Sequence, residues 1–160
     1  MPRVTEPDAA IYCSDLSIAR VSADTRVVDG VSLQVAPGEV VAVMGATGSG
    51  KSSLASCLAG ADHRDLRIVG GVGEVAGISL RARGRARRVL TYRTGHLRQG
   101  ANSDLPARLT ISEIVAEPIT ARDRKVNERA LALRVAALLD ELQLPIGASE
   151  KYPYELSSGM

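Results

Sequence analysis

The sequence predicts an α/β fold, in which strands surround the first helix and helices dominate the end of the chain. A short apolar run at residues 40–44 leads into a glycine-rich loop, and helix-forming residues follow from Ser52 to Ala59. Apolar and polar residues alternate between residues 31 and 35, as on a half-buried strand. Apolar residues recur at helical spacing within residues 127–144. These patterns predict strands and helices mixed within one chain.

The strands are expected mainly in the first half of the chain. Residues 11–35 are predicted to form strands, because the alternation at 31–35 is bordered by the turn dipeptides at 29–30 and 37–38. Residues 40–44, Val-Val-Ala-Val-Met, are continuously apolar between a turn and a glycine. This pattern predicts a strand that is buried on both faces.

A glycine-rich segment and an arginine-rich segment follow the first helix. Residues 71–76 match the loose dinucleotide-binding pattern G-x-G-x-x-A, but no convincing strand precedes them and Gly77 interrupts any helix after them. We therefore interpret these glycines as turns of a hairpin. Residues 81–98 contain seven Arg and no acidic residue, which is typical of a solvated helix face or loop. The alternative interpretation is a patch that binds phosphate or nucleic acid.

Two helices are predicted in the last third of the chain. Thr110 and Glu113 have the T-x-x-E spacing of a capping box, which starts a helix over residues 110–117, and Pro118 is expected to end or bend it. The second helix covers residues 127–144, with Asn127 as its N-cap and Pro145 as its stop. Four apolar residues at helical spacing form a stripe that we interpret as core packing: Leu131, Val135, Leu138 and Leu142.

The composition excludes several classes of protein. A chain of 160 residues with 45% hydrophobic and 24% charged residues buries a core without disulfides or metals, and disorder of the whole chain is not expected. Its only aromatic residues are four tyrosines, which argues against folds that stack RNA or single-stranded bases on aromatic rings. With 20 basic and 18 acidic residues, the net charge of +2 indicates neither nucleic acid nor an anionic membrane as a partner.

The sequence also contains no pattern for a signal peptide, a membrane span or a metal site. Residues 1–10 carry two acidic residues and two prolines, and no stretch approaches the roughly 18 apolar residues of a transmembrane helix. We interpret Cys13 and Cys57 as buried small apolar residues, which suits the reducing cytoplasm. His63 and His96 lie near no matching ligands, so neither is predicted to bind a metal.

The strongest functional motif is Gly-Ala-Thr-Gly-Ser-Gly-Lys-Ser at residues 45–52, which fits the Walker A pattern G-x-x-x-x-G-K-[ST]. Its glycines let the main chain approach a ligand, so that N–H groups surround an anion at the positive end of the next helix. Lys51 is expected to reach the β- and γ-phosphates, and the Ser52 hydroxyl to bind Mg²⁺. The predicted phosphate-binding residues are Gly45, Thr47, Gly48, Ser49, Gly50, Lys51, Ser52 and Ser53.

Three motifs in order give the sequence a family resemblance. Residues 29–45 resemble the start of an ATP-binding cassette (ABC) domain. Gln99 resembles the glutamine of the Q-loop, which leads into the helical subdomain of that family. Residues 152–160 resemble the ABC signature, usually written L-S-G-G-Q. The resemblance covers about residues 11–160, and Glu117-Pro118 together with the final Met is similar to the dipeptide, oligopeptide and nickel importers.

The resemblance implies a fold and a domain organisation. The fold would be α/β, a P-loop NTPase core of the ABC type with an antiparallel β region and a partial helical subdomain, truncated at the signature. Residues 1–160 would form the N-terminal part of one ABC nucleotide-binding domain. The β region and the P-loop core would occupy about residues 11–100, and the helical subdomain about residues 101–160.

The resemblance also implies a function. The chain would bind Mg-ATP as the ATP-binding subunit of an ABC transporter, which drives solute transport through a partner permease. A second ABC subunit, in a homo- or heterodimer, would complete each ATP site. Gln99 would join Ser52 at the Mg²⁺ ion, and Ser157, Ser158 and Gly159 would act on the partner's ATP. The subunit would be cytoplasmic, held at the inner face of the cell membrane by the permease, without a nucleic-acid partner.

The sequence departs from the family pattern at three points. Ser158 stands where the first signature glycine is usual. The aromatic residue that usually stacks on adenine falls near Arg20 or Val21, and a guanidinium group also stacks on a base. No Walker B motif with a catalytic Glu precedes Met160, so no catalytic residue is predicted and ATPase activity stays open. The alternatives are a vestigial or binding-only module without ATPase activity and, less favoured, a small P-loop kinase.

Overall fold

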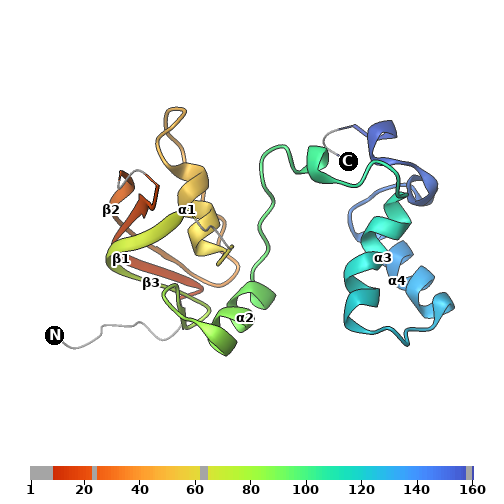
Figure 1. The fold of residues 1–160 in the computed structure, drawn as a ribbon, viewed down its shortest axis with the longest axis horizontal. Helices are drawn as coiled ribbons and strands as arrows, with labels where there is room; N and C mark the ends of the chain where they lie inside the picture. The colour runs from red at the N-terminus through yellow and green to blue at the C-terminus, as the bar shows by residue number, and fades with distance from the viewer. Residues whose placement is uncertain (1–8, 23–24, 62–64, 158–159) are drawn as a thin grey trace. The chain divides into compact units, whose positions relative to one another are not determined.

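The computed structural model describes residues 9–22, 25–61, 65–157 and 160 (Figure 1). The chain divides after Leu97 into two compact units. Within the described residues, the first unit contains an antiparallel sheet and two α-helices, and the second contains helices joined by turns and no strand. Each unit is described by itself.

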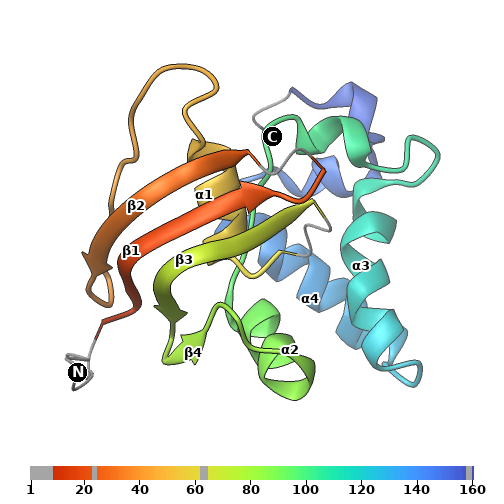
Figure 2. The same cartoon turned by 60° about the vertical axis from the view of Figure 1, so that its left-hand side comes forward.

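The first unit is built on a four-stranded antiparallel sheet with the strand order β2-β1-β3-β4 (Figure 2). Its strands are β1 (Ile11–Arg20), β2 (Arg26–Val35), β3 (Leu66–Val75) and β4 (Ile78–Ser79). The central strand β1 contributes Leu16 and Ile18, whose side chains are fully buried. In β2 the side chain of Val35 is buried and that of Gln34 is exposed, so the predicted alternation is confirmed.

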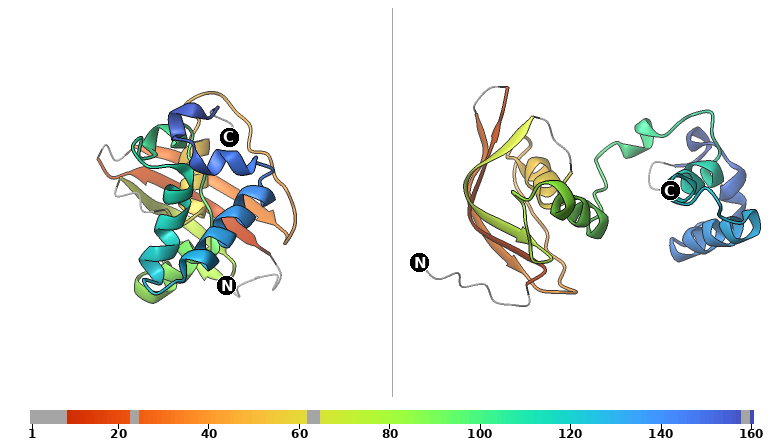
Figure 3. Two further views of the ribbon diagram at one scale, coloured as in Figure 1. Left: turned by 90° about the vertical axis from the view of Figure 1, so that its right-hand side faces the viewer. Right: turned by 60° about the horizontal axis from the view of Figure 1, so that its bottom comes forward.

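Two helices, α1 (Lys51–Leu58) and α2 (Gly84–Arg93), pack on the same face of this curved sheet (Figure 3). Leu54 of α1 and Leu90 of α2 enter an aliphatic core together with Leu16 and Ile18. Cys13 is buried in that core, which raises the pKa of its thiol to about 11 and leaves it as a small apolar residue at neutral pH. The predicted helix at 52–59 and the predicted burial of Cys13 are thus confirmed.

The glycine-rich segment is a hairpin, as its turn residues indicate. Strands β3 and β4 pair through Val75 and Ile78, and Ala76 and Gly77 between them both have positive φ angles, of 49° and 72°. The predicted hairpin is confirmed, but the interpretation of Gly71 and Gly73 as its turn was wrong, because both lie within β3, which begins at Leu66. In the next segment, α2 carries exposed arginines as predicted, but the side chain of Arg87 is half-buried and donates from Nη2 to the Ala61 carbonyl at 2.8 Å.

The predicted strand at residues 40–44 is wrong for this structure. The segment is irregular, and its side chains are open to solvent, with 94% of Val40 and 88% of Met44 exposed. A strand requires a neighbour that pairs with its backbone N–H and C=O groups. Within the described ranges all sheet pairings involve β1 to β4, and none involves this segment. Apolar composition alone therefore does not make the strand.

The second unit consists of α3 (Ile111–Arg122), α4 (Glu128–Glu141) and three short 3₁₀ helices. The 3₁₀ helices are η1 (Ala101–Asp104), η2 (Ile146–Glu150) and η3 (Pro153–Glu155). Ile111 of α3 packs with Val135 and Leu139 of α4 in a small apolar core. The predicted stripe was therefore wrong at its end: Leu139 turns inward, whereas Leu142 follows the last helical turn and is 71% exposed.

Both helices begin as their sequence predicts. At the start of α3, the Glu113 N–H donates to the Thr110 hydroxyl, and the Thr110 N–H donates to the Glu113 carboxylate at 2.7 Å. Asn127 Oδ1 accepts hydrogen bonds from two backbone N–H groups at the start of α4. Of the two expectations for Pro118, an end of the helix or a bend, the end is wrong, because α3 continues to Arg122. A proline removes its own N–H bond, but the Asp123 N–H still donates to the Ile119 carbonyl beyond it.

None of the helices in the described part of the chain is long and apolar enough to cross a bilayer. The longest is α4, with 14 residues. A single span needs about 20 predominantly apolar residues.

Candidate functional site

The predicted Walker A loop lies between β2 and α1, and its backbone conformation depends on glycine. Gly48 and Gly50 have φ angles of 83° and 90°, in the region that L-residues rarely adopt. Gly50 is also the N-cap of α1 and packs against β2. A Cβ at this position would lie 2.1 Å from the Val27 carbonyl oxygen, so only glycine fits.

Lys51, the first residue of α1, folds back over the loop. Its Nζ donates to the Gly45 carbonyl at 2.8 Å, to the Ala46 carbonyl at 2.7 Å and to Ser49 Oγ at 3.3 Å. The loop therefore curves around the ammonium group, which places a positive charge at its centre. Because an ammonium group has three N–H donors on a flexible stem, it can exchange these neutral acceptors for phosphate oxygens.

The N-terminus of α1 is open. No side chain of the described residues caps it, and its first turn has no acidic residue. The first intrahelical bond runs from the Leu54 N–H to the Gly50 carbonyl at 2.8 Å, so the N–H groups of residues 51–53 precede the helical ladder. Such N–H groups, together with the positive end of the helix dipole, favour an anion.

A cavity of about 200 Å³ lies beside this helix start. Loop residues 48–50 and helix residues 51–53 form one wall, and Arg20 and Val27 contribute from the sheet. The exposed hydroxyl of Ser52 and the half-buried hydroxyl of Ser53 belong to the same wall. Among the described residues, the lining contains two cations, Arg20 and Lys51, and no acidic residue, which suits a polyphosphate and a Mg²⁺ ion bound through it.

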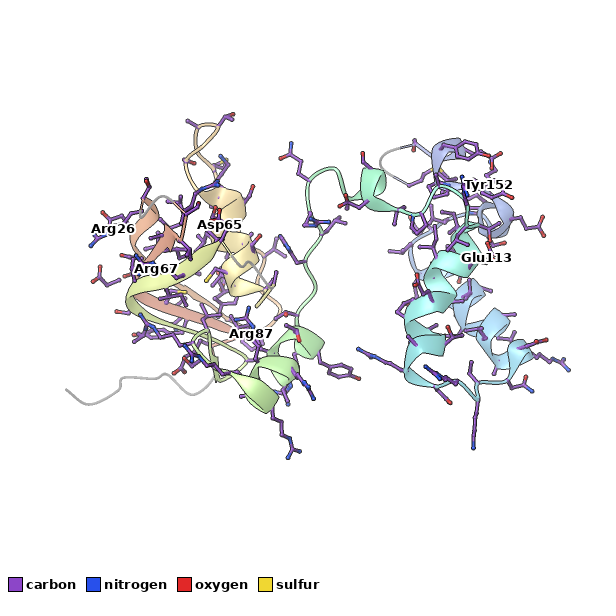
Figure 4. The ribbon with its side chains drawn as sticks, viewed as in Figure 1. Arg26, Asp65, Arg67, Arg87, Glu113 and Tyr152 are labelled. Carbon is purple, nitrogen blue, oxygen red and sulfur yellow. The ribbon has the colours of Figure 1, made fainter. Side chains whose placement is uncertain are left out.

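Arg20, the last residue of β1, is positioned by an acidic neighbour. Its Nη1 lies 3.4 Å from Asp65 Oδ2, and the Ser22 hydroxyl and N–H donate to Asp65 Oδ1 at 2.7 and 3.3 Å. These hydrogen bonds, more than the Arg20 charge, lower the pKa of Asp65 (Figure 4). The Val21 side chain is 54% exposed and does not line the cavity, so of the two predicted adenine contacts the structure brings only Arg20 to the loop.

The remaining predicted site residues lie elsewhere. Gln99 is exposed at a turn in the second unit, next to an ion pair between Arg98 and Asp104, and its role at Mg²⁺ stays a prediction. Ser157 is exposed near the end of the same unit, and its signature role also stays a prediction. Two signature residues and one histidine are outside the described residues: Ser158, Gly159 and His63.

Metal ligands are not concentrated anywhere in the described ranges: no group of three or more His, Cys, Asp or Glu side chains is arranged to bind an ion. His96 contacts Ser56 through Nε2 at 3.3 Å, which gives it a polar neighbour in the first unit. A Mg²⁺ ion at the loop would therefore depend on the Ser52 hydroxyl and on phosphate oxygens.

Two residues of this site were missed by sequence reasoning. Val27 closes the cavity from β2, and Asp65 positions Arg20 from the start of β3. Neither has a local signature, because Val27 is an ordinary strand residue and Asp65 is 45 residues away from Arg20. Only the pairing of β1 with β2 and β3 brings them to the loop.

Comparison with protein families agrees with this site. The model of the ABC transporter family matches residues 28–160, which include the whole loop. The oligopeptide transport ATP-binding protein OppF of Lactococcus lactis is 33% identical over 142 residues, and the match covers 88% of this chain and 43% of OppF. OppD of Mycobacterium tuberculosis is 33% identical over 146 residues, which cover 89% of this chain and 22% of OppD. The chain thus spans less than half the length of these relatives.

Solved structures show the same fold. The dimeric post-hydrolysis structure of the ATP-binding cassette MJ0796, bound to ADP and Pi, has a TM-score of 0.74 at 20% identity and covers 93% of this chain and 64% of that chain. The structure of cbiO1 from Clostridium perfringens, part of the complex cbiONQ, has a TM-score of 0.69 at 18% identity. The match covers 95% of this chain and 57% of the cbiO1 chain. The predicted α/β fold of the ABC type is confirmed.

Proposed function

Because the chain belongs to the ABC transporter family, we propose that it binds Mg-ATP at residues 45–53 and acts as the ATP-binding component of a transporter. The observation that carries this proposal is the combination of Lys51 Nζ at the centre of the loop with the open N-terminus of α1. Both features offer donors and positive charge in one small cavity. ATP binding by this family and the ADP and Pi bound to MJ0796 support the same ligand.

Each loop residue has a role in this proposal. The N–H groups of the loop and of residues 51–53 bind the β-phosphate, and Lys51 bridges the β- and γ-phosphates. The Ser52 hydroxyl binds Mg²⁺, with Gln99 completing its coordination. The Arg20 guanidinium, which Asp65 positions, stacks on the adenine ring. Phosphoryl transfer asks the protein mainly for positioning and charge neutralisation, and this loop contributes both.

The names of the relatives support a proposal for the transported solute, and the family supports a proposal for the partners and the location. OppF and OppD are named as oligopeptide transport proteins, so we infer a peptide or a peptide-like molecule as the transported solute. A second ABC subunit, in a homo- or heterodimer, would bring its loop to Ser157, Ser158 and Gly159. A permease would hold the subunit at the cytoplasmic face of the membrane. We assign about residues 11–100 to the β region and P-loop core, and about 101–160 to the helical subdomain.

Replacement of Lys51 tests ATP binding. We expect Lys51→Ala to weaken Mg-ATP binding by about ten- to a hundredfold, because a charge-assisted hydrogen bond contributes about 1.5–3 kcal/mol. Lys125→Ala removes an exposed lysine in the second unit and is the matched control. Isothermal titration calorimetry measures both affinities. Equal affinity in the two variants would contradict the site, and no binding by the wild-type chain would favour a vestigial module.

A further inference from the structure

A second and larger cavity of the first unit contains an unusual set of side chains. It measures about 690 Å³ and lies between α1, β3, the segment after β4 and the start of α2. Four arginines line it: Arg67, Arg81, Arg83 and Arg87. Among the residues that the structure describes, no acidic residue lines it, and none of its lining residues borders the loop cavity. In sequence, no acidic residue occurs between Glu74 and Asp104.

Three of these guanidinium groups, those of Arg81, Arg83 and Arg87, keep N–H donors that the described residues do not use. Arg87 Nη2 donates to the Ala61 carbonyl at 2.8 Å, and Arg81 Nη1 donates to the Gly71 carbonyl at 2.6 Å. Each guanidinium has five N–H donors, so both keep donors for a ligand. The side chain of Arg83 makes no hydrogen bond or ion pair with any of the described residues. Figure 4 labels Arg67 on β3 and Arg87 on α2.

The charges of two of these arginines act inside the cavity. Cys57, which lines it from α1, has its pKa raised by burial, and the charges of Arg87 and Arg81 act in the opposite direction. Among the described residues, no acidic side chain lines the cavity beside Arg81, Arg83 and Arg87, so these three guanidinium groups keep positive charge toward it. The start of α2 at Arg83 and Gly84 adds to this charge, because no described side chain caps it and its first turn has no acidic residue.

The other wall of the cavity is apolar. Leu66 and Ile68 of β3 and Leu80 after β4 line it. Cavities of about 300–1,000 Å³ are the size that accepts small molecules. A ligand that satisfies both walls needs an oxyanion for the arginines and a hydrocarbon body for the aliphatic side chains.

We propose that this cavity binds a small amphipathic anion, a carboxylate or phosphate ester with an apolar body, at Arg81, Arg83 and Arg87. The site is separate from the ATP loop and does not depend on the proposed ATP binding. The oxyanion lies against Arg81, Arg83 and Arg87 at the start of α2. The apolar body lies along Leu66, Ile68 and Leu80.

Decanoate and its uncharged analogue decanol test the proposal by isothermal titration calorimetry on the whole chain. We expect wild type to bind decanoate at least about tenfold more tightly than decanol, because charge-assisted hydrogen bonds require the carboxylate. Arg83→Gln should weaken decanoate binding about tenfold or more. Arg88→Gln removes an exposed arginine of α2 outside the cavity and should have no effect. Equal affinities for Arg83→Gln and Arg88→Gln, or for decanoate and decanol, would overturn the proposal.

Two further measurements test the cavity without relying on the arginine variants and distinguish it from the ATP loop. Decanoate should slow the alkylation of Cys57 by iodoacetamide in the wild-type chain, followed by peptide mass mapping, because Cys57 lines the cavity. Buried Cys13 reports any general unfolding. Unchanged alkylation of Cys57 at saturating decanoate would contradict the site. Lys51→Ala should bind decanoate like wild type, and a loss there would place the anion at the ATP loop instead.

Discussion

The starts of α1 and α3 differ in what satisfies their first backbone N–H groups. At α3, Thr110 and Glu113 bond to each other's backbone, and these hydrogen bonds from Thr110 lower the pKa of Glu113 (Figure 4). At α1, the N-cap is a glycine, which has no side chain that could accept a hydrogen bond. The Lys51 ammonium group lies over the preceding loop, where it donates to the Gly45 carbonyl. A helix whose own residues close its N-terminus is structural. An open N-terminus leaves these donors and the positive end of the helix dipole accessible to an anion, which is the role that we propose for α1.

Among the substitutions at the two helix starts, Gly50→Ala should have the largest effect on ATP binding and stability. The substitution puts a Cβ 2.1 Å from the Val27 carbonyl oxygen and forces an L-residue into a left-handed conformation that alone costs about 1–2 kcal/mol. We expect loss of detectable ATP binding and a lower melting temperature, measured by calorimetry and by thermal unfolding. Gly48→Ala carries the same kind of strain, but nothing lies within 4 Å of its Cβ. If the two variants lose ATP affinity and melting temperature equally, the packing of Gly50 against Val27 of β2 is not what sets the loop conformation.

Ser52→Asp should give α1 an acidic residue in its first turn, as Glu113 does in α3. A carboxylate in the first turn stabilises a helix by about 0.3–1 kcal/mol, and here it would also repel phosphate. We therefore expect slower amide hydrogen exchange in α1 together with at least about tenfold weaker ATP binding, since a lost charge-assisted contact is of that size. Ser112→Asp makes the same change in α3 and should leave ATP binding unaltered. Tighter ATP binding by Ser52→Asp would contradict an anion site at this helix.

Thr110→Ala should have the smallest effect and should be confined to the second unit. Loss of an N-cap side chain costs about 0.5–2 kcal/mol of helix stability. Faster amide exchange in α3, with unchanged ATP affinity, is the expected result. Thr120→Ala removes a hydroxyl that bonds only to carbonyls within the same helix and serves as the control. A comparable change in ATP affinity would show that the two helix starts are not functionally distinct.

The sequence by itself determined the features that depend on neighbours in the chain. The capping box at Thr110, the cap at Asn127, the alternation in β2 and the Walker A motif each need only residues within a few positions of one another. For the same reason the motif at residues 45–52 is enough to locate the candidate site along the chain. Hydrogen bonds within one turn and side chains on alternating faces are local consequences of backbone geometry.

Only the tertiary structure decided what depends on distant partners. The apolar run at 40–44 was predicted as a buried strand, yet it is irregular and exposed, because burial and pairing come from other segments and not from the run itself. Arg20 and Val27 reach the loop through the pairing of β1, β2 and β3, and Arg67 and Arg83 line one cavity because the helices pack on that sheet. A linear pattern contains the arginines, but only the fold encloses a cavity between them.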